Sequence, residues 1–237
     1  MTDLSKVHHI VIGYDKIEEY KININILRNA FIKGGDLLIT AIFNGSNYNE
    51  LEARYQGNKV NNFIILRENR GYVWGAIDAI QKALTFVDTL ADKREVVLFT
   101  NFDGIFFSEE RYNKLIDDFI KSSKLFGAGF CIIEGEVPLF CDLMLFRREF
   151  VSSFYEGMAK VNPAPPRWEG DKWNCEKHMW ATLNIIGDAD KLWWRFERDD
   201  ESQDGRSYIF HKEYGFGHCH GKHNIEKKLN EYGTFNI

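Results

Sequence analysis

The chain has 237 residues, of which 44% are hydrophobic and 15% aromatic, so it can bury the core of one large domain. Its formal net charge of -5 lacks the basic surplus that is typical of proteins binding nucleic acid or anionic membranes. Four scattered cysteines without a CxxC pair favour reduced thiols, and no stretch approaches the roughly 20 apolar residues of a membrane span. These properties predict an ordinary globular protein of the cytoplasm, without a transmembrane segment and without nucleic acid as a partner.

The first half of the chain alternates between predicted strands and helices. Residues 8–13 (HHIVIG) form a β-branched run, and the next twenty residues carry apolar side chains at helical spacing, namely Tyr20, Ile24, Leu27 and Phe31. Further strands are expected at 36–47, 61–69 and 95–107. One helix is expected to begin after Gly71. A second helix is expected at 108–124, after the last of these strands, with Ser108 as its cap.

This alternation predicts an α/β fold, in which a mainly parallel, Rossmann-like sheet carries helices on both faces. In such sheets ligands bind beyond the carboxyl ends of the strands, where the strand order reverses. The turns that follow Ile12, Phe43, Arg67 and Phe102 are therefore the expected positions of a binding site.

The pattern changes in the second half of the chain. Residues 127–135 and 139–150 predict two more strands, and residues 162–174 form a loop rich in proline and tryptophan. A helix is expected at 175–186. The tail beyond Asp188 is rich in aromatic, histidine and charged residues, without a periodicity that predicts an element.

The turn "ENRGYVWGA" (68–76) offers backbone N–H groups at the start of a helix. Gly71 and Gly75 lack side chains, so a bulky anion such as a diphosphate can approach the main chain closely. Glycines before a helix are also common turn residues, and the segment matches neither GxGxxG nor a P-loop.

The segment "FTNFDG" places Asn101 and Asp103 two residues apart at the end of an apolar strand. Side chains at that spacing leave a strand on the same face, so the two oxygens can hold a hard divalent cation against phosphate oxygens. The alternative is a strand-ending turn in which Asp103 only bends the chain.

Three carboxylates lie near the start of the helix predicted at 175–186: Glu169, Asp171 and Glu176. One of them, near an acceptor hydroxyl, can act as a general base. Each can equally be an ordinary solvated carboxylate.

A late segment, "HKEYGFGHCHGKHN" (211–224), gathers metal-binding residue types: His211, His218, Cys219, His220 and His223. No standard tetrahedral zinc spacing is complete. A single histidine that completes the coordination of a cation held mainly by Asp103 is the other interpretation, and surface histidines are the third.

In order along the chain, "IVIGYD", "ITAIFNGSN", "IILRENRGYVWGAIDAIQKAL", "VVLFTNFDG", "LMLFRREF" and "CEKHMWATL" resemble glycosyltransferase family 2, especially its rhamnosyltransferase-like members. The resemblance covers roughly residues 7–187. It implies a GT-A fold and transfer of a sugar from a nucleotide-diphosphate sugar to a hydroxyl of a glycan or other acceptor, as in polysaccharide biosynthesis. One domain is implied, with a nucleotide-sugar half (1–126) and an acceptor half with a small C-terminal extension (127–237).

The resemblance also implies roles for individual residues. The nucleoside would lie among Tyr14, Asp15 and Asn44, and the donor would border the turn containing Asn69, Gly71, Trp74 and Gly75. Asp103 would bind Mn²⁺ or Mg²⁺, assisted by Asn101 and by His218 or His220. Glu176, or else Asp171, would be the base, and direct attack would invert the anomeric configuration.

The sequence departs from the family pattern at several positions. Phe43 stands where an acid usually contacts the nucleobase, and Asn101 replaces the first acid of the DxD motif. Trp74, Ala76 and Ile77 replace the usual small and amide residues. A catalytically degenerate domain that binds a sugar or a partner is the alternative function. Sugar nucleotidyltransferases are a further rival, although "IGYDKIEEY" lacks their glycine-rich loop.

Overall fold

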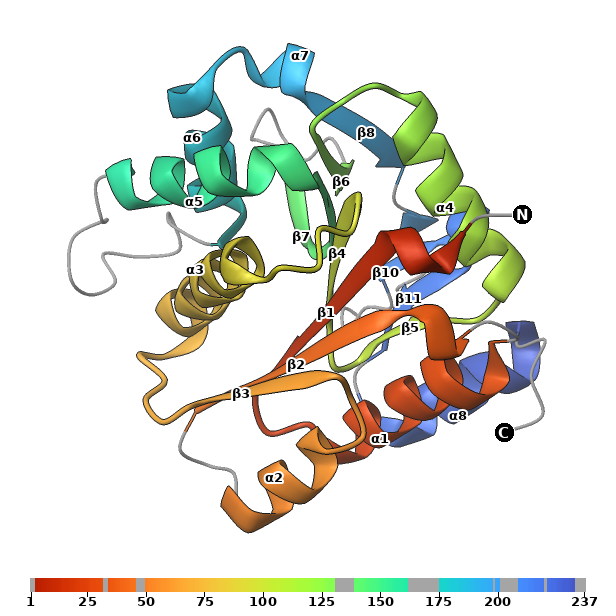
Figure 1. Ribbon diagram of the computed structural model, residues 1–237. Helices are drawn as coiled ribbons and strands as arrows, with labels where there is room; N and C mark the ends of the chain where they lie inside the picture. The colour runs from red at the N-terminus through yellow and green to blue at the C-terminus, as the bar shows by residue number, and fades with distance from the viewer. Residues whose placement is uncertain are drawn as a thin grey trace.

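The computed structural model describes residues 3–31, 34–45, 50–130, 139–161, 175–197, 199–200, 209–219 and 221–232 of the chain (Figure 1). A seven-stranded sheet in the order β3-β2-β1-β4-β7-β6-β8 occupies the centre of this described part. Its strands are β1 (Val7–Gly13), β2 (Leu38–Asn44), β3 (Asn62–Leu66), β4 (Val96–Asn101), β6 (Phe126–Phe130), β7 (Leu139–Arg147) and β8 (Trp193–Glu197). β1, β2 and β4 are buried along nearly their whole length, because both faces of the sheet are covered.

The strand directions confirm the predicted α/β fold. β3, β2, β1 and β4 are parallel, β7 runs antiparallel to β4 and β6, and β8 is parallel to β6. The chain moves outward from β1 to β2 and β3, then returns to the other side of β1 as β4. The strand order therefore reverses between β1 and β4, whose carboxyl ends are adjacent, with Ile12 opposite Asn101.

Helices cover both faces of the central sheet (Figure 1). One face packs on α3 (Tyr72–Thr89), α5 (Val151–Lys160) and α6 (Cys175–Ile186), and the other on α1 (Ile17–Asn25), α2 (Glu50–Gly57), α4 (Glu109–Lys121) and α8 (Lys222–Tyr232). Neighbouring strand residues point to opposite faces of the sheet. Ile10 packs in the core beneath α3, α5 and α6, and Val11 packs in the core on the other face. The shorter helical segments are η1 (Leu4–Lys6), η2 (Ile26–Ala30), η3 (Gly34–Asp36), η4 (Arg148–Phe150), α7 (Ala189–Leu192) and η5 (Lys212–Tyr214). No helix in the described residues is long and apolar enough to cross a membrane.

A second sheet, with four antiparallel strands in the described residues, has the order β5-β11-β10-β9. It consists of β5 (Gly104–Phe106), β9 (Asp199–Asp200), β10 (Ile209–His211) and β11 (Phe216–His218). β5 starts three residues after β4 ends, and His218 of β11 pairs opposite Gly104. The C-terminal part of the chain is thereby brought to the turn that follows β4.

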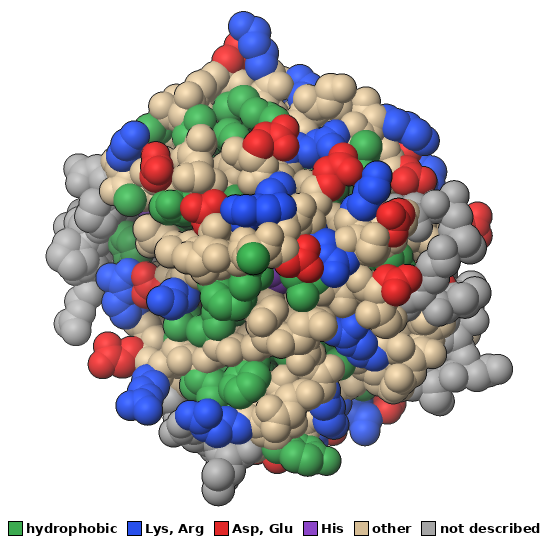
Figure 2. All heavy atoms as spheres, viewed as in Figure 1, with side chains coloured by type: hydrophobic (Ala, Val, Ile, Leu, Met, Phe, Trp, Pro, Cys, Tyr) green, Lys and Arg blue, Asp and Glu red, His purple; other side chains and the backbone are tan. Residues whose placement is uncertain are grey.

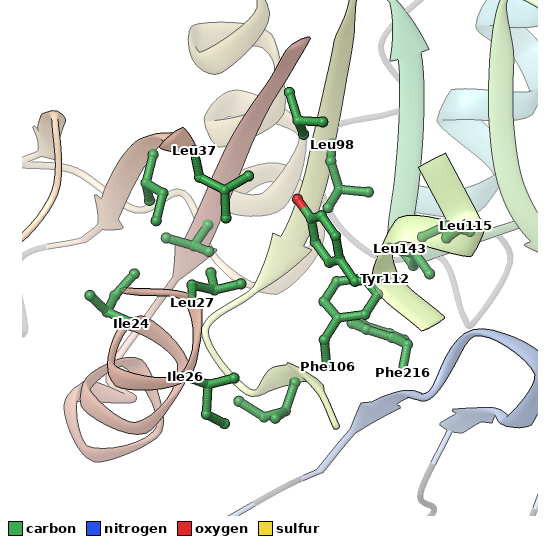
Figure 3. Close-up of a cluster of buried hydrophobic side chains, with 14 of the residues drawn as sticks. Ile24, Ile26, Leu27, Leu37, Leu98, Phe106, Tyr112, Leu115, Leu143 and Phe216 are labelled. Carbon is green, nitrogen blue, oxygen red and sulfur yellow. The ribbon is translucent and has the colours of Figure 1, made fainter. Parts of the chain in front are cut away.

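Aromatic packing holds this second sheet in place (Figure 3). The ring centroid of Phe106 lies 4.6 Å from that of Tyr112 on α4 and 5.0 Å from that of Phe216 on β11. All three side chains are buried. Burial of each such side chain contributes roughly 1.5–3 kcal/mol, so short strands can be held by the core beneath them.

The predicted elements of the first half agree with the structure, except that α2 was not predicted and one predicted strand is divided in two. The helix expected at 175–186 has the predicted bounds, and Ser108 caps α4 by accepting a hydrogen bond from the backbone N–H of Arg111. The strand expected at 95–107 is instead two strands, because β4 ends at Asn101 and the chain turns at Asp103 into the second sheet. The tail without periodicity contains short strands and a helix.

Two buried histidines in β1 make stability depend on pH. His8 and His9 contact the hydroxyls of Thr40 and Thr100 at 2.7 and 2.9 Å, and burial lowers the pKa of each imidazole to about 3. Between pH 6.5 and pH 3 the unfolded chain therefore binds protons that the folded chain does not, so stability falls as the pH falls. At pH 5 the lowered pKa of each histidine reduces the free energy of unfolding by about 2 kcal/mol.

Urea unfolding at pH 7.5 and pH 5 measures this loss. The double variant His8→Gln/His9→Gln keeps amide groups that can bind the threonines but does not titrate, so we expect its stability to change with pH by about 4 kcal/mol less than that of the unmodified chain. An equal pH dependence in both proteins would contradict the assignment.

Candidate functional site

The carboxyl ends of β1 and β4 are locked together by a close backbone contact. The N–H of Phe102 donates to the carbonyl of Ile12 at 2.8 Å, and the Phe102 ring lies over Gly13. A Cβ at Gly13 would stand only 2.0 Å from Cδ2 of Phe102, so the close approach requires glycine at this position. The next residue, Asp103, is therefore placed beside the turn that follows β1.

Asp103 lies at the centre of the candidate site and is only 1% exposed. Its Oδ2 forms an ion pair with the ammonium of Lys16, and its Oδ1 lies 3.1 Å from Nε2 of His218. The backbone carbonyl of Asp103 accepts a hydrogen bond from the N–H of Cys219 at 2.9 Å. Three distant segments, the turn after β1, the turn after β4 and the end of β11, thus meet at one buried carboxylate.

The Asp103 carboxylate also controls the charge of His218. Burial alone lowers the pKa of this imidazole, but its attraction to Asp103 and its hydrogen bond to Asp103 raise the pKa by more, with a smaller contribution from Asp142. The net result is a raised pKa, so the protonated form of His218 is favoured beside Asp103. Figure 2 shows acidic and basic side chains intermingled over the described part of one face, without a large region of a single charge.

The predicted donor turn is held by a set of amide contacts. Asn44, at the end of β2, donates from Nδ2 to the carbonyl of Gly75 at 2.7 Å. Asn69 donates to the carbonyl of Asn44 at 3.2 Å and accepts from the N–H of Gly71 at 2.9 Å. Gly71 adopts a φ of 99°, which favours glycine, and it precedes the first turn of α3. The glycine turn before a helix is therefore present as predicted.

Packing within the turn gives one reason for glycine at position 75. Gly75 is buried inside α3, and a Cβ there would lie 2.0 Å from Oδ1 of Asn69. The missing side chain therefore makes room for Asn69, which in turn holds Gly71. Gly75 therefore has a role in positioning the turn, and a direct approach of an anion to its main chain stays a prediction.

Tyr14 and Asn44 are brought together around Gly45. Gly45 has a φ of 132°, and a Cβ on it would meet the Tyr14 ring at 2.6 Å and Cβ of Asn69 at 3.1 Å. Tyr14 is 42% exposed, whereas Asn44 is buried and its Oδ1 has no hydrogen-bond partner among the described residues. Asp15 is exposed and has a φ of 53°, in the left-handed region. The ring face and the amide oxygen border one corner of the site.

Trp74 is contacted by Arg70, which lies in the turn just before its helix. The guanidinium of Arg70 lies 5.5 Å from its ring centroid, and Arg70 Nε binds Asp78 at 2.6 Å. The Trp74 side chain is half-buried. Its contact with a donor stays a prediction.

The sequence did not indicate a buried pair whose carboxylate is among the charges that raise the pKa of His218. His211 and Asp142 are both buried, with Nε2 3.4 Å from Oδ2. Nδ1 of His211 is 2.8 Å from the carbonyl of Glu197, which can only accept, so Nδ1 carries a proton. Leu143 pairs with Thr100, which places Asp142 near the end of β4. The one sequence feature that could have indicated this pair is Asp142, a charged residue inside the apolar run "LFCDLM".

Glu176 lies in the first turn of α6 and is half-buried. α6 packs against β7, the strand that carries Cys141 and Asp142. Burial and then Cys175, Glu176 and Asp142 raise the pKa of the Cys141 thiol, as expected for a Glu176 carboxylate near the start of this strand. Three of the predicted residues, Glu169, Asp171 and His220, fall outside the described residues.

The histidine-rich segment does not form a zinc cluster in the described part of the chain. His211 contacts Asp142, His218 contacts Asp103, and His223 is exposed on α8. No group of three or more His, Cys, Asp or Glu side chains that could hold a metal occurs among the described residues. His218 is the histidine of this segment that contacts Asp103, and its role at a cation stays a prediction.

Comparison with known proteins identifies the fold. No protein-family model and no curated protein matches the sequence. Among solved structures, a protein assigned as a glucose-1-phosphate thymidylyltransferase from Bacillus anthracis, in complex with sucrose, is similar at a TM-score of 0.55, with 9% identity over 98% of this chain and 97% of that one. A 4-diphosphocytidyl-2C-methyl-D-erythritol synthase from Anaerococcus prevotii gives 0.53, with 10% identity over 96% and 97%.

A glycosyltransferase is also among the similar structures. The mannosyltransferase of Pyrobaculum calidifontis, in complex with GDP-Man and Mn²⁺, has a TM-score of 0.50 and 13% identity over 82% of this chain and 56% of its own length. The fold is that of nucleotidyltransferases and GT-A-like proteins. At these identities the likeness concerns the fold alone.

The contact between Gly75 and Asn69 predicts the effect of Gly75→Ala. Alanine favours a helix over glycine by up to about 1 kcal/mol, but here its methyl group displaces the Asn69 amide and breaks its hydrogen bonds. We expect a net loss of about 1–3 kcal/mol, seen as a Tm lower by roughly 3–10 °C. In the control Gly35→Ala, the Cβ meets nothing within 4 Å, so Tm should not fall. An unchanged or higher Tm for Gly75→Ala would show that Asn69 does not hold the turn.

Proposed function

We propose that the protein is a metal-dependent, inverting glycosyltransferase that moves a sugar from a nucleotide-diphosphate sugar to a hydroxyl of a glycan or other acceptor. The observation that carries the proposal is the position of Asp103. Its carboxylate is buried where the strand order reverses, at the carboxyl ends of β1 and β4, and two basic side chains contact it. In open α/β sheets this is the place for a nucleotide and its phosphates.

The nucleoside would bind at the corner formed by Tyr14, Asp15 and Asn44. The exposed Tyr14 ring offers an aromatic face for a base. Oδ1 of Asn44 is a buried acceptor that a ligand N–H or hydroxyl can satisfy. Asn69, Gly71 and Gly75 form the turn next to this corner, with Trp74 on the same helix, so the sugar-diphosphate would border the start of α3.

A divalent cation suits the chemistry of Asp103. Mg²⁺ and Mn²⁺ prefer oxygen ligands, and Mg²⁺ is usually bound by one or two carboxylates together with substrate phosphates. Asp103 supplies one carboxylate, with the Asn101 amide two residues before it and the His218 imidazole beside it. His220 lies outside the described residues. When bound, the cation would neutralise the negative charge that grows on the leaving diphosphate.

Glu176 is our choice for the general base, with Asp171 as the second choice. It is half-buried at the start of α6, the helix that packs against β7. A carboxylate in that position can accept the proton of an acceptor hydroxyl as the hydroxyl attacks the sugar. Direct attack inverts the configuration at the anomeric carbon.

Two other functions are separable by experiment. Nucleotidyl transfer is suggested by the likeness to nucleotidyltransferases over nearly the whole chain, and it would consume a sugar phosphate and a nucleoside triphosphate and release pyrophosphate. A degenerate binding domain is suggested by Asn101 in place of an acid. Such a domain would bind a sugar or a partner without turnover.

A thermal-shift screen tests the proposed donor class, since a ligand that binds the native state raises the apparent stability. The probes are UDP-, GDP-, CMP- and dTDP-sugars, each with and without Mn²⁺. We expect a rise in Tm with one nucleotide class, and a larger rise when Mn²⁺ is present. The absence of any rise would refute nucleotide-sugar binding, and pyrophosphate release from a nucleoside triphosphate would favour nucleotidyl transfer instead.

Substitutions should separate metal binding from proton transfer. Asp103→Asn removes the carboxylate, so the Mn²⁺-dependent part of the donor shift should disappear. Glu176→Gln should keep that shift and lower transfer by roughly 10²–10⁴-fold, the usual contribution of a general base. Glu110→Gln, an exposed carboxylate in the first turn of α4, is the control and should change neither. Full activity of either site variant would refute its assigned role.

A further inference from the structure

Lys16 is a charged residue at the centre of the candidate site. The sequence pattern indicated no role for it. It follows Asp15 in the turn after β1 and directly precedes α1. Its side chain is 30% exposed, whereas that of Asp103 is 2% exposed, and the two form an ion pair through Oδ2. The ammonium therefore lies between a buried carboxylate and solvent.

A divalent cation and Lys16 would compete for the same carboxylate. His218 lies at Oδ1 of Asp103 and Lys16 at Oδ2, so both oxygens have basic partners. Like charges a few ångströms apart repel strongly in a partly buried site. A metal that reaches Asp103 must therefore displace the Lys16 ammonium or share the carboxylate with it.

The protein alone offers this metal few ligands. Asn101 provides a neutral amide in place of a second carboxylate, and no group of three or more His, Cys, Asp or Glu side chains suited to a metal occurs within the described residues. Such a site gains affinity when phosphate oxygens complete the coordination. The diphosphate also offers Lys16 a new anionic partner, which the long and flexible lysine side chain can reach by a change of rotamer.

We propose that Lys16 is a tethered cation that holds Asp103 until a diphosphate arrives, so that the divalent metal enters together with the nucleotide and not ahead of it. The proposal rests on the proposed function, because it assumes that a nucleotide diphosphate binds at this edge of the sheet. Lys16 then stabilises the empty site with its charge and, once moved, binds the diphosphate.

Mn²⁺ and nucleotide titrations of the full chain test this exchange. Free Mn²⁺ is followed by electron paramagnetic resonance, with no nucleotide and with UDP, GDP, CDP or dTDP. The unmodified chain should bind Mn²⁺ weakly alone and at least roughly tenfold more tightly with one of these nucleotides. Lys16→Met should bind Mn²⁺ alone at least roughly tenfold more tightly than the unmodified chain, and should bind the nucleotide at least roughly tenfold more weakly.

Two further variants keep the test decisive. Lys16→Arg retains the charge, so it should retain tight nucleotide binding. Lys16→Gln can still donate a hydrogen bond to Asp103, so it replaces Lys16→Met if the latter fails to fold, with the same expected direction. Lys21→Met is the matched control on α1, because Lys21 binds Glu18 at 2.7 Å, and it should change neither affinity.

The outcomes are distinguishable. If the unmodified chain binds none of the four nucleotides, the proposed function and this exchange both fail. If it binds one of them, but loss of the Lys16 charge leaves the affinities for Mn²⁺ and for that nucleotide unchanged, only the exchange is refuted. Tight binding of Mn²⁺ alone by the unmodified chain also refutes it.

Discussion

The packing of Phe102 on Gly13 is the constraint on which the candidate site depends. The Phe102 ring also lies 4.7 Å from that of Tyr20 and 5.2 Å from that of Phe43, so residues from β2, α1 and the turn after β4 share one buried cluster. Because this ring is fixed on both sides, the following Asp103 has little freedom, and the turn after β1 is held against it. A preorganised carboxylate suits binding of charged groups, since little has to be ordered when the ligand arrives.

Burial of the Asp103 carboxylate is tolerated because the second sheet supplies His218, one of its two basic partners. An isolated buried carboxylate is costly, and it is retained only where opposite charges or hydrogen bonds surround it. His218 arrives through the pairing of β11 with β5, and that pairing is held by the Phe106, Tyr112 and Phe216 side chains. The charge pair is thus maintained by hydrophobic packing of nearby residues, since Phe106 lies three residues after Asp103 and Phe216 two residues before His218.

The sequence predicted the parallel half of the fold well, because its strands are long, apolar and separated by amphipathic helices. It also singled out Asp103, Asn44 and the turn at Gly71, all of which follow strand ends. The second sheet was missed because β5, β9, β10 and β11 have only two or three residues each, too few to show a period of two. Lys16 was missed because it is 87 residues from Asp103 and carries no motif, so only tertiary packing joins them.

The charges around Asp103 favour a particular kind of ligand. Lys16 already compensates the carboxylate, so a bare divalent cation would bring surplus positive charge into a partly buried site. A metal bound to a diphosphate brings its own negative charge, and the phosphate oxygens give Lys16 a new partner. The site has one carboxylate and one amide, Asp103 and Asn101, in place of two acids. It can still suit a nucleotide-diphosphate sugar, because the Lys16 ammonium already supplies part of the positive charge that the diphosphate needs.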